Sequence, residues 1–92
     1  MPGEDDRFAP ADTISWHDAG DELTLFDSAS DRYFALNGAA VAIWRELAAG
    51  ARVGEAIATL AARFGCPREA IAGDIATFIR TALDRKLIVA RG

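Results

Sequence analysis

The sequence predicts an α+β domain in which a three-stranded antiparallel sheet is followed by three helices, an arrangement similar to a winged helix-turn-helix. Apolar and polar residues alternate over residues 13–36, whereas apolar residues recur at three- and four-residue spacing over the rest of the chain. Turn-forming residues separate the strands, and glycine or proline separates the helices. A chain of 92 residues has room for one such domain.

The three predicted strands are residues 13–17, 22–27 and 31–36, and Ser28-Ala29-Ser30-Asp31 has the composition of a tight hairpin turn. A consistent apolar side determines the register of this hairpin, because a slip of one residue would invert every side chain. The expected pairs are Ser28–Asp31, Leu25–Phe34, Leu23–Leu36, Phe26–Tyr33 and Thr24–Ala35. The strand order 1-2-3 leaves the third strand at an edge of the sheet.

The third strand runs into the first helix without a loop. We expect Asn37 to be the N-cap, since its side chain can accept from the first N–H groups of the helix. Apolar residues then follow at helical spacing, at Ala40, Ile43, Trp44 and Leu47. Such a junction would hold the edge of the third strand in a fixed orientation.

The helices are predicted at residues 38–49, 54–63 and 67–85, and residues 87–89 close the chain as a short extended segment. Gly50 ends the first helix, and Pro67 begins the third. The residues expected to face the core in the second and third helices are Ile57, Leu60, Ala61, Phe64, Ile71, Ile75, Phe78, Ile79 and Ala82.

The first twelve residues are acidic and contain two prolines, so we expect a flexible tail at 1–12 and a single domain at 13–92. The tail resembles neither a signal nor a transit peptide, and no apolar run approaches the roughly 18–20 residues needed to span a bilayer. A cytoplasmic location without membrane contact follows. The net charge of −4 argues against a nucleic acid as the main ligand.

Catalytic chemistry is not indicated. His17 and Cys66 are the only histidine and cysteine, lie far apart in the sequence, and have no matching orienting group. Motifs for metals, nucleotides and phosphates are absent as well. We therefore expect no enzyme activity and no cofactor.

DNA binding through the second and third helices is an alternative, because the break between them has helix-turn-helix length. The outward residues of the third helix mix charges of both signs: Glu69, Asp74, Thr77, Arg80, Thr81 and Asp84. Carboxylates facing a phosphate-rich groove would be repelled, which disfavours this alternative. A further alternative is a subunit that only stabilises a larger enzyme.

Addition of an extended peptide to the third strand is another possibility. Asp74, Phe78, Thr81 and Arg85 fall on one strip of the third helix and would face that strand across a groove. On periodicity alone, an amphipathic helix with surface charges is the better explanation of this strip.

Several motifs resemble the PqqD family, whose fold is the recognition element for precursors of ribosomally made, modified peptides. The "LN…G/A…IW" signature is matched by Leu36-Asn37, Ala40 and Ile43-Trp44, and Gly50 matches the glycine that ends the family's first helix. The C-terminal pattern is matched by Asp74-Ile75, Phe78-Ile79, Leu83 and Leu87-Ile88. The resemblance covers residues 23–89. Lys86 departs from it, standing where the family has glycine, and Ala51-Arg52-Val53 replaces the usual threonine cap.

This resemblance implies a non-catalytic adaptor that binds the leader segment of a precursor peptide and presents it to a modifying enzyme. In the family that enzyme is a radical S-adenosylmethionine protein, as in pyrroloquinoline quinone synthesis, or a leader peptidase, as in lasso-peptide pathways. Carried onto this chain, the peptide-binding residues are Arg32, Tyr33, Phe34 and Ala35 on the strand and Asp74, Phe78, Thr81 and Arg85 on the helix. The resemblance leaves open a monomer or a homodimer.

Overall fold

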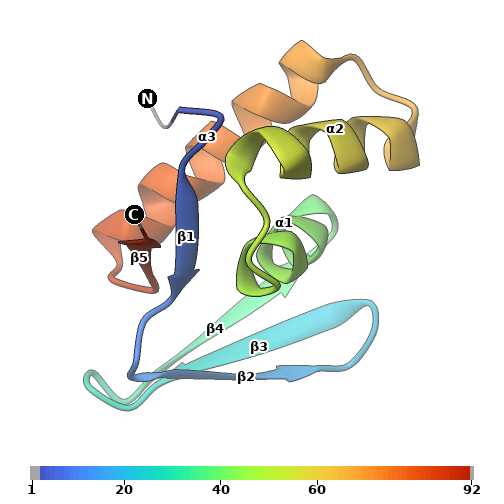
Figure 1. Ribbon diagram of the computed structural model, residues 1–92. Helices are drawn as coiled ribbons and strands as arrows, with labels where there is room; N and C mark the ends of the chain where they lie inside the picture. The colour runs from blue at the N-terminus through green and yellow to red at the C-terminus, as the bar shows by residue number, and fades with distance from the viewer. Residues whose placement is uncertain (1–2, 92) are drawn as a thin grey trace.

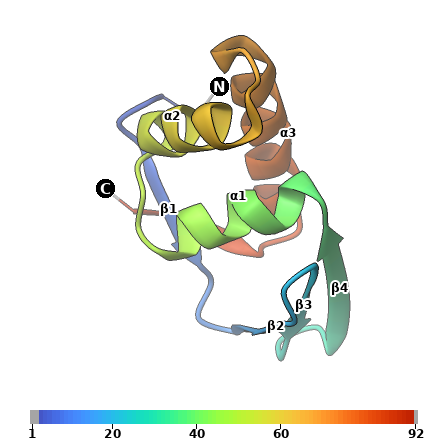
Figure 2. The ribbon, with the colours of Figure 1, turned by 90° about the vertical axis from the view of Figure 1, so that its right-hand side faces the viewer.

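Three helices and two antiparallel sheets make up the fold in the computed structural model, which describes residues 3–91 (Figure 1). The elements are β1 (Arg7–Pro10), β2 (Ile14–Asp18), β3 (Glu22–Asp27), β4 (Arg32–Asn37), α1 (Ala39–Ala48), α2 (Val53–Phe64), α3 (Arg68–Asp84) and β5 (Ile88–Arg91). The α+β class, the three-stranded antiparallel sheet and the three helices that follow it are as predicted, whereas β1 is an additional strand. Helix α1 lies between the β2-β3-β4 sheet and α2, as two perpendicular views show (Figure 2).

The β2-β3-β4 sheet has the strand order and the register that the sequence predicts. Leu23 pairs with Leu36, Leu25 with Phe34, and Phe26 with Tyr33. Leu23 and Leu25 are fully buried, whereas Tyr33 on the opposite side is 73% exposed. The alternation of apolar residues therefore determined which side of the hairpin faces the helices.

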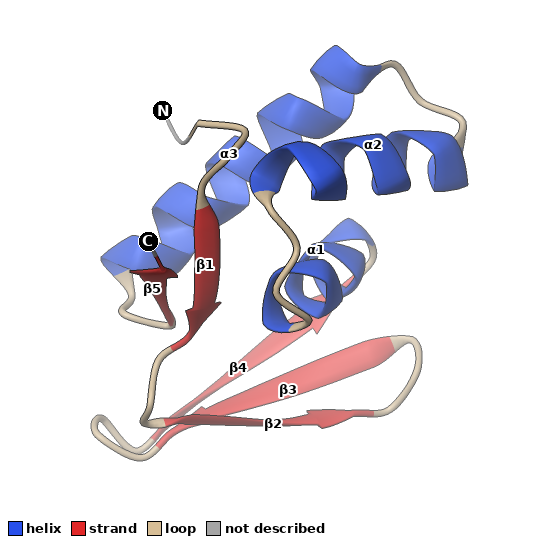
Figure 3. Cartoon of the chain, viewed as in Figure 1, coloured by secondary structure: helices blue, strands red, loops and turns tan. Residues whose placement is uncertain are grey.

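The prediction of a flexible N-terminal tail is wrong for the part of residues 1–12 that the structure describes. Residues 7–10 form β1, which pairs with the closing strand β5 (Figure 3). Phe8 of β1 is buried in the core. This strand was missed from the sequence because Phe8 lies in an acidic segment. Before β1, the carbonyl groups of Glu4 and Asp6 accept hydrogen bonds from Gly54 and Val53 at the start of α2. Met1 and Pro2 lie outside the described residues.

The junction between β4 and α1 also differs from the prediction. Gly38, not Asn37, is the N-cap of α1, and no side chain caps the helix. Its dihedral angles, φ 59° and ψ −134°, lie in a region that is essentially restricted to glycine. The chain thus turns from β4 into α1 through a backbone conformation that glycine adopts easily. This turn sets the direction of the helix without a side-chain cap.

The core is built on Trp44, whose side chain is 1% exposed, together with the apolar sides of all three helices. The predicted core residues of α2 and α3 are buried except for two. Phe78 is only partly buried, and Phe64 is 46% exposed because it is the last residue of α2. Trp16 of β2 packs edge-on against Trp44, with ring centroids 5.4 Å apart.

A bidentate ion pair ties the β2-β3 turn to α1. Nε and Nη2 of Arg45 donate to the Asp18 carboxylate over 2.7 and 2.6 Å, and Nη2 also donates to the Gly20 carbonyl. Hydrogen bonding by Arg45 lowers the pKa of Asp18 to about 2. This contact fixes the turn between β2 and β3 relative to α1.

All three helices end in Schellman-type hydrogen bonding around a residue with positive φ. This residue is the cap itself in α2, Gly65, and it follows the cap in α1 and α3, at Gly50 and Lys86. At the end of α3, Leu87 N–H donates to Ala82 and Lys86 N–H donates to Leu83. Lys86 has φ 59°, so it adopts the strained geometry that the family's glycine would adopt freely.

Lys86→Gly is expected to raise the free energy of unfolding by about 0.5–1 kcal/mol, because relief of left-handed strain exceeds the added flexibility of the unfolded chain. Urea unfolding measures the change. Lys86→Ala is the matched control and should bring no gain, since alanine keeps the Cβ atom. An equal gain in both variants would place the effect in the lysine side chain instead of the backbone.

Candidate functional site

The outer edge of β4 carries backbone groups that pair with no strand among residues 3–91. In an antiparallel sheet, successive residues direct their N–H and C=O groups to alternate sides. The Ala19 N–H donates to the Glu22 carbonyl, so the backbone N–H and C=O of Glu22 face β2, and those of the next residue, Leu23, face β4. Leu23 pairs with Leu36, so the backbone groups of Leu36 and, two residues earlier, of Phe34 form hydrogen bonds with β3. The backbone groups of the alternate residues Tyr33, Ala35 and Asn37 therefore point outward, away from the sheet.

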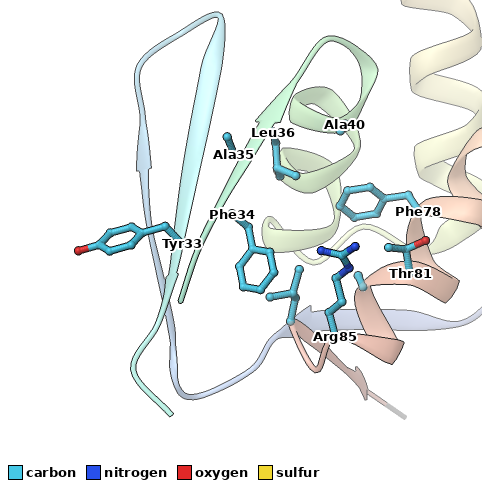
Figure 4. A pocket seen from close by; sticks show the side chains of 10 residues that line it. Tyr33, Phe34, Ala35, Leu36, Ala40, Phe78, Thr81 and Arg85 are labelled. Carbon is cyan, nitrogen blue, oxygen red and sulfur yellow. The ribbon is translucent and has the colours of Figure 1, made fainter. Parts of the chain in front are cut away.

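A groove of about 370 Å³ runs between this edge and α3 (Figure 4). From β4 and the start of α1 it is lined by Tyr33, Phe34, Ala35, Leu36 and Ala40, and from α3 and its end by Phe78, Thr81, Ala82, Arg85 and Leu87. Most of these side chains are apolar, so the groove offers a surface for apolar side chains of a ligand.

One cationic side chain, Arg85, lines the groove, with its guanidinium group between the Phe34 and Phe78 rings (Figure 4). The guanidinium carbon of Arg85 lies 5.8 Å from the centroid of the Phe34 ring, within range of a cation–π contact. Within the described residues, the ion pairs involve Arg45 and Arg68, and Arg85 has no carboxylate partner. The guanidinium is therefore available to an anionic group of a ligand (Figure 4).

The groove brings together six of the eight site residues predicted from the sequence: Tyr33, Phe34, Ala35, Phe78, Thr81 and Arg85. Arg32 and Asp74 are not part of its lining. Arg32 lies at the hairpin end of β4, where it pairs with Asp27, and Asp74 lies one helical turn before Phe78.

Four lining residues were missed by the sequence reasoning: Leu36, Ala40, Ala82 and Leu87. Leu36 and Ala40 belong to the "LN…G/A…IW" signature, so the signature itself could have indicated them. Leu87 follows the end of α3, and its place in the groove depends on the turn at Lys86.

His17 and Cys66, which the sequence did not favour as catalytic residues, lie outside the groove. His17 is exposed on β2, and Cys66 is exposed between α2 and α3. Residues 3–91 contain no cluster of three histidine, cysteine or acidic side chains that could hold a metal ion. Over the same residues, no helix has both the length and the apolar character required to cross a bilayer.

A family model described as coenzyme PQQ synthesis protein D (PqqD) matches residues 22–88, which is most of the chain. This chain belongs to the PqqD family. The resemblance drawn from the sequence is thereby confirmed, over nearly the range expected. The match begins at β3, so β1 and β2 lie outside it.

The PqqD-family fold is also found in a solved structure, TbiB1 in complex with the TbiA(beta) leader peptide. The TM-score is 0.83 at 24% sequence identity, and the match covers 87% of this chain and 93% of that one. At this identity the likeness concerns the fold. No curated protein matches the chain.

Amide hydrogen exchange should alternate along β4 in the free protein. The N–H groups of Phe34 and Leu36 bond to β3 and are expected to exchange slowly, whereas those of Tyr33 and Ala35 should exchange at least about tenfold faster. Exchange followed by two-dimensional NMR measures this directly. Uniform protection of all four amides would mean that the outer edge is covered.

Proposed function

We propose that this PqqD-family chain is a non-catalytic adaptor that binds the leader segment of a ribosomally made precursor peptide. The leader adds as a strand to the outer edge of β4, and its side chains enter the groove against α3. The observation that carries the proposal is the unpaired edge of β4 beside an apolar groove. The leader peptide bound to TbiB1, a protein of the same fold, supports it.

Backbone hydrogen bonds would give this adaptor affinity with little dependence on sequence. Tyr33 and Ala35 offer two N–H and two C=O groups, and each new hydrogen bond contributes about 0.5–1.5 kcal/mol. Ordering a flexible leader opposes this gain. Burial of apolar leader side chains adds to it, so we expect a dissociation constant in the micromolar range or below, about −8 kcal/mol or better.

Selectivity would come from alternate side chains of the leader, because successive residues of a strand point to opposite sides. One set would face Phe34, Leu36 and Phe78, which favours apolar residues. A carboxylate of the leader near Arg85 would form an ion pair with its unpartnered guanidinium. Tyr33 packs against Phe26 on the other side of the sheet, so it contributes to the groove mainly through its backbone.

The adaptor would present the rest of the precursor to a modifying enzyme, either a radical S-adenosylmethionine protein or a leader peptidase. The adaptor itself would supply position: the lining of the groove contains no pair of side chains arranged as a nucleophile and its base. The proposed binding residues are Tyr33, Phe34, Ala35, Leu36, Phe78, Thr81 and Arg85.

Phe78→Ala is expected to weaken leader binding about tenfold, because it removes the largest apolar side chain that α3 contributes to the groove. Isothermal titration with a synthetic peptide that covers the leader of the precursor, to be sought among the neighbouring genes, measures the effect. Phe64→Ala is the matched control, since Phe64 is exposed at the end of α2 and outside the groove. Equal affinity of the parent and Phe78→Ala would show that the groove is not the leader site.

Salt dependence separates leader binding from DNA binding. A strand-addition groove with one cation should lose only about threefold in affinity between 50 and 200 mM salt, since few charges are neutralised. Binding to a DNA duplex through phosphate contacts would fall by orders of magnitude over that range. A steep fall in affinity for the leader peptide would contradict the proposed mode of binding.

A further inference from the structure

A row of three arginines lies on and beside the β1-β5 ribbon, away from the groove. Arg7 of β1 pairs with Arg91 of β5, and it also forms an antiparallel bridge with Arg52 just before α2. Directly opposed residues of antiparallel strands have their side chains on the same side, with Cβ atoms about 4.5–5.5 Å apart. The start of β1 lies beside the loop that leads into α2, as the ribbon shows (Figure 1). These three residues are the arginine row.

The arginine row is electrostatically unfavourable in the isolated chain. Like charges that face each other across strands repel, and all three side chains are exposed. Arg52 is in addition the N-cap of α2, where the helix dipole disfavours a positive charge. The chain as a whole has a net charge of −4, so this concentration of positive charge is local.

Three of the acidic residues close to the arginine row in the sequence are engaged elsewhere, and Asp5 forms no salt bridge with it. The Glu4 carboxylate pairs with Arg68 over 2.8 Å, and the Asp6 carboxylate accepts from the Gly3 N–H over 2.8 Å. The Glu55 carboxylate accepts from a backbone group, the Arg52 N–H, over 2.7 Å. Among the residues that the structure describes, none of the salt bridges involves the arginine row.

A cavity of about 350 Å³ adjoins two of these arginines. Arg7 and Arg91 line it together with the mostly apolar residues Phe8, Ala9, Leu47, Ala48, Ala49 and Gly50. Guanidinium groups bind carboxylates in a two-pronged geometry, and the apolar part can receive an apolar side chain. The cavity shares no lining residue with the groove between β4 and α3.

We propose that the arginine row and this cavity form a docking surface for an acidic segment of a second protein, with aspartate or glutamate on both sides of an apolar residue. The apolar lining favours a polypeptide over a polyphosphate, and the overall negative charge of the chain repels nucleic acid. The leader groove stays open while this surface is occupied. If the acidic segment belongs to the modifying enzyme, its docking here rests on the proposed function. Binding of an acidic segment to this surface does not depend on that function.

The test uses two capped peptides, Glu-Glu-Leu-Glu-Glu and Gln-Gln-Leu-Gln-Gln, titrated into the ¹⁵N-labelled protein at low salt. The glutamate peptide should shift the amide signals of Phe8, Gly50 and Arg91, and the glutamine peptide should not. Arg7→Gln/Arg91→Gln should weaken binding of the glutamate peptide about tenfold, from the loss of two partly exposed charge contacts. Arg63→Gln/Arg80→Gln removes the same charge from exposed positions elsewhere and should leave the affinity unchanged.

Equal responses to the two peptides, or equal affinity in the double variant and the parent, would overturn the proposal. Tighter binding of inorganic phosphate or of a DNA duplex at the same amides would overturn it as well. Because removing like charges relieves repulsion, the double variant should melt no lower than the parent, and its amide spectrum reports whether it is folded. Arg91→Gln alone, near the end of β5, repeats the test with a smaller change.

Discussion

The outer edge of β4 pairs with no other strand in the part of the chain that the structure describes, and the proposed peptide binding rests on this. An exposed strand edge invites unwanted pairing, and proteins usually cover it or interrupt it. Here the edge is short and is flanked by Phe78 of α3 and by Arg85, the residue that caps this helix. These side chains restrict what can approach. In the proposed mode of binding, a single extended peptide lies between the strand and the helix, whereas a second sheet would collide with the helix.

The position of that edge is set by contacts on both sides of it. The register with β3 buries Leu23 and Leu25, and Gly38 turns the chain directly into α1. On the other side, the end of α3 is held by the ribbon of β1 and β5, because Ala11 N–H donates to the carbonyl of Leu87 over 3.0 Å. Leu87 also lines the groove, so the N-terminal strand helps to fix the wall that faces β4.

The sequence was most informative where one physical signal dominated. Alternating apolar residues predicted the β3-β4 register pair by pair, and the helical spacing at Ile43, Trp44 and Leu47 predicted the buried side of α1. The N-terminal strand was missed because Phe8 is one apolar residue in an acidic segment, and its partner β5 lies about 80 residues away. The Gly38 cap was missed because propensity favours asparagine, whereas the direct turn required a backbone conformation that asparagine rarely adopts. Helical spacing put Asp74 on the groove strip, but spacing alone cannot show how far the groove extends along α3.

The most direct measurement is the pattern of nuclear Overhauser effects between the labelled protein and an unlabelled leader peptide. Strand addition predicts contacts from the α protons of the peptide to the backbone of Tyr33 and Ala35, with peptide side chains close to the Phe78 ring. Contacts confined to β2, at the opposite edge of the sheet, or to the exposed side of α3 would contradict the account.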